Sequence, residues 1–140
     1  MQSLFDRMSV VFAAGCIGAL VNSVLVWYLG HQGIPQQVGV HIAPVWSKHF
    51  LYPRIVWGGL WGFVFLLPVL RGGWLISVFT RGIFFSLGPT LVQLFYVFPF
   101  LAHKGMMGFS LGTLTPLFVF FYNAVWGLTA AQWIRMCGKP

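Results

Sequence analysis

The sequence predicts an all-α membrane protein with four transmembrane helices in one bundle and a long first extramembrane loop. Only 6% of the residues are charged, and 59% are hydrophobic. Asp6 is the single acidic residue of the 140. Soluble domains are about 25% charged, so this chain has too little polar surface to cover a soluble fold. Four apolar segments also have the length of about 20 residues that crosses a bilayer core.

The four predicted spans follow one another without a linker or an internal repeat, so residues 1–140 are expected to form one integral membrane domain. They cover residues 9–29, 52–70, 83–102 and 111–134. Pro53 suits the first turn of the second span. After the turn signal Arg71-Gly72-Gly73 the chain is apolar again over 74–79. We expect a short interfacial helix there, although the third helix starting at Leu75 is the alternative.

The loop between the first two spans, residues 30–51, is the longest connection. It is polar at first and then becomes apolar and aromatic towards Trp46 and Phe50. Loops of this length usually carry structure or function of their own. We expect a segment lying in the membrane interface, with Trp46 and Lys48 at the water boundary.

Basic residues predict the orientation. Four spans place the N-terminus, the second loop and the C-terminus on one side of the membrane. That side carries five basic residues, Arg7, Arg71, Arg81, Arg135 and Lys139, and the other carries three, Lys48, Arg54 and Lys104. The excess of positive charge predicts a bacterial inner-membrane protein with both termini in the cytoplasm.

Polar side chains within the spans form the first candidate site. Asn22, Gln93 and Asn123 lie inside apolar helices, where an amide must face protein or water rather than lipid. Tyr96 and Tyr122 are expected nearby. These groups either bond helix to helix or recognise a carbonyl of a bound molecule. Gly88-Pro89 is expected to break the third helix next to Gln93.

All four histidines fall on the non-cytoplasmic side. His31, His41 and His49 lie in the first loop, and His103 ends the third span. Imidazole is a common metal ligand, so a shared ligand or metal site is one interpretation. The wide spacing and the lack of an acidic neighbour favour ordinary interfacial residues instead.

Small residues spaced four apart predict close helix packing. Gly15, Gly18, Gly58 and Gly62 belong to such pairs, which let two helix backbones approach each other. The partner is either another span of this chain or a second membrane protein.

The composition argues against an enzyme. No second carboxylate exists for acid–base work, and no acid lies near a histidine to complete a triad. The sequence identifies no cofactor, and its eight dispersed basic residues do not indicate nucleic acid.

Three functional hypotheses remain open. The first is a non-catalytic subunit that packs against partner membrane proteins or copies of itself within the lipid bilayer. The second is a small oligomeric transporter or channel for a neutral or lipid-like solute, and the third is a subunit that binds haem or a pigment.

Overall fold

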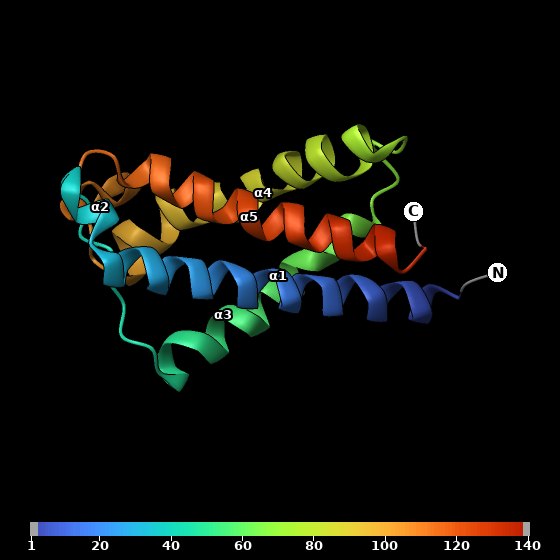
Figure 1. Cartoon of the computed structure of the whole chain (residues 1–140), viewed down its shortest axis with the longest axis horizontal. Helices are drawn as coiled ribbons and strands as arrows, with labels where there is room; N and C mark the ends of the chain where they lie inside the picture. Colours follow the sequence, from blue (N-terminus) through green and yellow to red (C-terminus); the bar gives the residue numbers. More distant parts are fainter. Residues whose placement is uncertain (1–2, 139–140) are drawn as a thin grey trace.

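Helix α1, Leu4–Gln32, is the longest single helical element of the described residues (Figure 1). The computed structural model describes residues 3–138. The Ser3 side chain caps the first turn by accepting a hydrogen bond from the Asp6 backbone N–H at 3.1 Å. Gly33 ends the helix in the left-handed conformation, with φ of 78°. The helix is therefore longer at both ends than the predicted span of residues 9–29.

A shorter, irregular helical segment runs back along α1. It consists of α3, Lys48–Trp61, and a tighter 3₁₀ segment η1, Gly62–Leu66. The Ser47 side chain caps α3. Leu67 is extended, as the residue before a proline tends to be, and the helical segment ends there. The predicted second span of residues 52–70 is thus helical only as far as residue 66.

The next helix is continuous from Leu75 to Leu101 and contains three parts. These are a wide-turned π segment η2, Leu75–Thr80, then α4, Arg81–Val92, and a second π segment η3, Gln93–Leu101. The separate interfacial helix predicted over 74–79 is therefore wrong, because these residues begin the third long helix. Trp74 Nε1 donates to Gln132 Oε1 at 2.7 Å, which fixes this start against α5.

The helix also continues through Gly88-Pro89, where a break was predicted. The backbone changes character four residues later, at Gln93, where π-type turns begin. A proline lacks the N–H that an α-helical turn would use. Wider turns are a usual way to accommodate a disturbed hydrogen-bond ladder, and they often occur at functional sites.

The last helix, α5, Thr115–Met136, packs on both α1 and α4. A short 3₁₀ segment, η4, Met106–Leu111, precedes it. The predicted first loop of residues 30–51 is shorter in the structure, because α1 extends to Gln32 and α3 begins at Lys48. Between them lies one four-residue helix, α2, Ile34–Gln37. The His41 backbone N–H donates to the Leu111 carbonyl at 2.8 Å, which ties the loop to the connection before α5.

The all-helical class is confirmed, since the described residues contain helices and no strand. Three helices are long and apolar enough to cross a membrane: Leu4–Gln32, Leu75–Leu101 and Thr115–Met136. The segment over residues 48–66 is not one of them, because its α-helical part has only 14 residues. The beginning of α1 and the end of α5 lie at the same end of the molecule (Figure 1).

The predicted glycines pack inside this chain. A Cβ placed on Gly15 would lie 2.2 Å from the Gly58 carbonyl oxygen, and one on Gly62 would lie 2.3 Å from that of Val11. A Cβ on Gly18 would lie 2.6 Å from the Trp126 carbonyl oxygen. These distances leave no room for a side chain, so the glycines allow α1 to touch α3, η1 and α5.

A second glycine contact, between Gly82 of α4 and Gly127 of α5, was not predicted. A Cβ on Gly127 would lie 2.1 Å from the Gly82 carbonyl oxygen. Two glycine contacts, α1 with α3 and α4 with α5, therefore set the helix spacing on either side of the molecule.

Gly15→Ala should destabilise the fold although alanine is the better helix former. The new methyl group meets backbone rather than a movable side chain, and overpacking typically costs about 1–3 kcal/mol, more than the gain of about 1 kcal/mol in helix propensity. Thermal unfolding in mild detergent should show a lower midpoint than wild type. Gly73→Ala is the control, because a Cβ there meets nothing within 4 Å. Equal midpoints for the two variants would contradict the packing described here.

Candidate functional site

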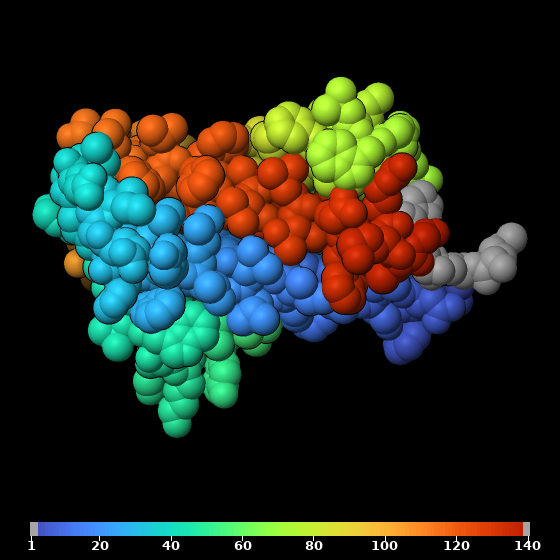
Figure 2. Space-filling view, in the orientation of Figure 1, coloured from blue at the N-terminus to red at the C-terminus, as the bar shows by residue number. Residues whose placement is uncertain are grey.

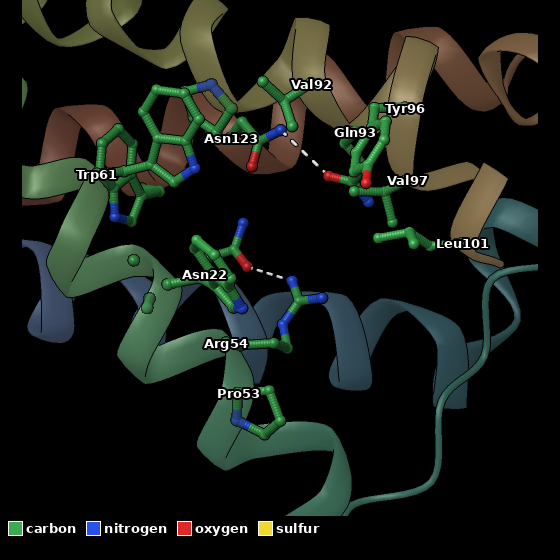
Figure 3. Close-up of a pocket in the computed structure, with 15 residues that line it drawn as sticks. Asn22, Pro53, Arg54, Trp61, Val92, Gln93, Tyr96, Val97, Leu101 and Asn123 are labelled. Carbon is green, nitrogen blue, oxygen red and sulfur yellow. Dashed lines mark hydrogen bonds between the residues drawn. The ribbon is translucent and has the colours of Figure 1, made fainter. Parts of the chain in front are cut away.

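A cavity of about 400 Å³ separates α3 from the α4–η3 part of the third helix (Figure 3). Helix α1 contributes Ala19 and Asn22 to its lining, and α5 contributes Asn123 and Trp126. The α3 side contributes Pro53, Arg54, Trp57, Gly58 and Trp61, and the opposite side contributes Pro89, Val92, Gln93, Tyr96, Val97 and Leu101. Figure 2 shows the α3 region projecting from the body beside α1, which is the arrangement that leaves this space open.

Arg54 is the charged group of the cavity. Its side chain is half-buried and reaches from α3 to α1 (Figure 3). Nε donates to Ser23 Oγ at 2.9 Å, and Nη2 donates to Asn22 Oδ1. The guanidinium also lies over the Phe50 ring, 4.9 Å from its centroid. The recorded bonds use Nε and Nη2, which leaves Nη1 without a partner among residues 3–138.

No side-chain carboxylate can neutralise Arg54. Asp6 is the single acidic residue of the chain, and it lies in the first turn of α1. Asn22 stands roughly 24 Å further along that helix at about 1.5 Å per residue. Neutral groups thus hold the guanidinium in place while its positive charge stays uncompensated. A buried charge without a counterion is costly, which makes an anion at this position favourable.

Asn22 of α1 links Arg54 of α3 to the backbone of α5. It accepts from Arg54, and its Nδ2 donates to the backbone carbonyl of Tyr122 on α5. The Asn22 side chain is 4% exposed. Its hydrogen-bonding capacity is therefore used within the protein, and its role towards a ligand is to orient Arg54.

A second polar group lies on the other wall. Asn123 Nδ2 donates to Thr90 Oγ1 at 3.1 Å and contacts Gln93 Oε1 at 3.4 Å. Gln93 and Asn123 both line the cavity, facing the side from which Arg54 enters (Figure 3). Amide groups there can donate to or accept from a bound molecule. The cavity therefore has one charged wall and one neutral polar wall.

Aromatic and aliphatic side chains make up the rest of the lining. Trp61 stacks over Gly88, which has room for no side chain of its own, because a Cβ there would be 2.9 Å from the indole ring. Trp126 Nε1 donates to the Gly15 carbonyl at 3.1 Å, so its polar atom is already satisfied. Trp57 and Tyr96 are half-exposed at the rim. An apolar cavity with a few fixed polar groups is the usual form of a small-molecule site.

The predicted polar cluster is largely brought together. Asn22, Gln93, Asn123 and Tyr96 line one cavity. Tyr122 contributes its carbonyl, while its hydroxyl is buried with no hydrogen-bond partner recorded in the described residues. Arg54 was missed as a site residue, since it was counted among the basic residues that mark the end of a span. One feature of the sequence could have identified Arg54 as a site residue. Arg54 follows Pro53 inside a predicted apolar span, and no acidic residue lies near it in the sequence.

The histidines do not form a shared site. All four are exposed. His31 stacks on Trp27 with ring centroids 5.6 Å apart, and His103 has a left-handed backbone with φ of 55°. Across residues 3–138, no group of three or more His, Cys, Asp or Glu side chains is placed to hold a metal ion.

The fold and the cavity define an all-helical protein with three helices able to span a membrane and one half-buried arginine in a mainly apolar cavity. Comparisons with protein-family models, with curated proteins and with solved structures found no match to this chain.

Asn22→Leu should lower stability, because it removes an acceptor from Arg54 and a donor from the Tyr122 carbonyl. Leaving buried polar groups unpaired costs about 1–3 kcal/mol. The measurement is the thermal midpoint in detergent. Val24→Leu is the control on the same helix, since Val24 is 43% exposed. A midpoint for Asn22→Leu equal to that of this control would show that the bonds contribute nothing.

Proposed function

We propose that this chain is a non-catalytic, multi-pass membrane protein that binds a lipid-like molecule with an anionic head group in the cavity beside Arg54. The observation that carries the proposal is a half-buried guanidinium, held by Asn22 and Ser23, with no carboxylate to pair with it. An anionic group would supply the missing charge, and an apolar chain would lie against the aromatic lining.

The lining supports an amphipathic rather than a purely polar ligand. Trp57, Trp61 and Leu101 offer apolar surface, whereas polar groups are contributed by Arg54, Gln93 and Asn123 (Figure 3). Apolar contacts contribute roughly 25 cal/mol per Å² buried. Trp57 and Tyr96 at the rim are half-exposed, as residues flanking an entrance from the lipid would be. Carriage of a lipid-like solute, one of the functions predicted from sequence, fits this site better with an anionic head than with a neutral one.

The topology completes the proposal. Residues 48–66 would be the fourth pass, with both termini on the cytoplasmic side of a bacterial inner membrane. The beginning of α1 and the end of α5 lie at the same end of the molecule in Figure 1, which supports an even number of passes. With Arg54 and Arg81 turned into the protein, the basic residues left for orientation are Arg7, Arg71, Arg135 and Lys139 against Lys48 and Lys104. Lys139 lies outside the described residues, and the excess still favours cytoplasmic termini.

The other two hypotheses receive less support from the site. The subunit hypothesis drew on glycine surfaces, and these pack against helices of the same chain. Packing against a partner membrane protein or a second copy of this chain would have to use surfaces other than these glycines. A haem or pigment would need axial ligands, and the histidines are exposed and dispersed.

Arg54→Gln should weaken binding of an anionic amphiphile while sparing a neutral one. Glutamine keeps one amide N–H₂ donor group but removes the charge. Charged hydrogen bonds contribute about 1.5–3 kcal/mol, so we expect at least a tenfold loss of affinity, roughly 1.4 kcal/mol. The measurement is retention of radiolabelled lysophosphatidic acid, compared with monoacylglycerol of the same chain length, by protein in nanodiscs.

Lys48→Gln is the matched control, since it removes the same charge from an exposed position on the same helix. It should bind both probes as wild type does. Equal retention of lysophosphatidic acid by wild type and Arg54→Gln would refute the proposal, as would a wild-type preference for the neutral probe. Thermal midpoints of both variants should show that each is folded.

A further inference from the structure

A second, smaller cavity lies at the opposite end of the molecule from the first loop, and three arginines converge on it. It has a volume of about 90 Å³, enough for several waters or a small oxyanion. Arg71, Arg81 and Arg135 line it together with Ser77. They come from the turn before η2, from the start of α4 and from the last turn of α5, segments that meet near the chain ends in Figure 1.

Arg81 is the buried member of this group. Its side chain is 1% exposed. Nη2 donates to the carbonyls of Phe65 and Leu67, the latter at 3.0 Å. The guanidinium also lies against the rings of both Phe65 and Phe85, at 5.3 and 5.5 Å from their centroids. Its Nε is buried and has no hydrogen-bond partner within the described part of the chain.

The two outer arginines are exposed and stand at the rim. Arg135 Nη1 donates to Ser77 Oγ at 3.0 Å, and Ser77 Oγ donates to the Gly73 carbonyl at 2.9 Å. These bonds fix the α5 arginine beside the start of the third helix. Most donors of Arg71 and Arg135 are left for another partner.

Three like charges around one small cavity repel each other unless an anion lies between them. The chain cannot supply that anion from a side chain near the site, because Asp6 is its single acidic residue and is exposed in the first turn of α1. The beginning of α1 lies on the far side of the C-terminal part of α5 from η2 in Figure 1. No ion pair involving these arginines is formed within residues 3–138.

We propose that this cavity is a phosphate-binding site, taking either a free phosphate or the phosphate of an anionic lipid. Guanidinium groups match phosphate oxygens in shape and charge. The oxygens of a tetrahedral oxyanion accept hydrogen bonds from several directions. This suits a cavity whose arginine donors come from three different segments of the chain. The small volume admits the head of a ligand, and an attached chain would leave past the exposed rim.

The site is independent of the lateral cavity at Arg54, which has its own lining residues. Arg81 also ties η1 to α4 through its bonds to backbone carbonyls, so replacing it would test folding as much as binding. The informative variant is therefore R71Q/R135Q, which leaves Arg81 in place. R7Q/K104Q is the matched control, because it removes two positive charges from residues that line neither cavity.

The experiment measures inorganic phosphate binding to the full chain in a phosphate-free nonionic detergent by calorimetry, with sodium chloride at matched ionic strength as reference. A parallel arm measures phosphatidylglycerol retained from mixed micelles by native mass spectrometry. We expect R71Q/R135Q to weaken binding at least about tenfold, and R7Q/K104Q to stay within about twofold of wild type.

Binding of inorganic phosphate with no preferential lipid retention would identify a free phosphate as the ligand, and the reverse would identify the lipid. The proposal is overturned if wild type binds neither probe, or if the two double variants lose binding equally. Inorganic phosphate lacks the apolar chain proposed for the cavity at Arg54. Loss of its binding in R71Q/R135Q therefore reports on this site, whereas loss of lysophosphatidic acid retention in Arg54→Gln reports on the other.

Discussion

A chain with one carboxylate has to hold the arginines inside its helical body with neutral acceptors. Arg54 donates hydrogen bonds to Asn22 and Ser23. Arg81 donates to backbone carbonyls and lies against two phenylalanine rings. Such partners satisfy N–H donors, yet they cancel no charge. Each guanidinium therefore keeps a net attraction for anions, strengthened by the low dielectric around it. Both candidate sites arise from this single constraint, one between helices and one at the end where the chain termini lie.

The position of the lateral cavity follows from where the helices touch. Gly15 and Gly58 bring α1 and α3 into backbone contact, and Gly82 with Gly127 does the same for α4 and α5. Helix α3 thus packs against α1, and a cavity remains between α3 and the α4–η3 part of the third helix. Residues of η3, the segment with wide π-type turns, line that space. The irregular backbone is therefore part of the candidate site.

Several elements were predictable because they depend on local chemistry. The apolar segments signal helix directly, whereas the local signals of Ser3 and Gly33, which cap α1, lie outside the predicted span of residues 9–29. Residues 74–79 were misassigned because an apolar hexapeptide after a Gly-Gly turn suits either an interfacial helix or the start of a span. The bond from Trp74 to Gln132, 58 residues away, decides between them. The bond from the His41 N–H to the Leu111 carbonyl, which ties the first loop to the connection before α5, likewise joins residues far apart in the sequence.

By itself the sequence determined the helical class, three of the four predicted apolar helices, and the polar side chains that must face protein, because burial of an amide in lipid is costly wherever the helix packs. It therefore identified Asn22, Gln93 and Asn123. Only the tertiary structure decided that Arg54 joins them and that Arg81 meets Arg71 and Arg135. An arginine near the end of an apolar segment can extend to water or turn inwards with equal local ease. The choice rests on which neighbouring helix presents acceptors, and that is a property of packing rather than of local sequence.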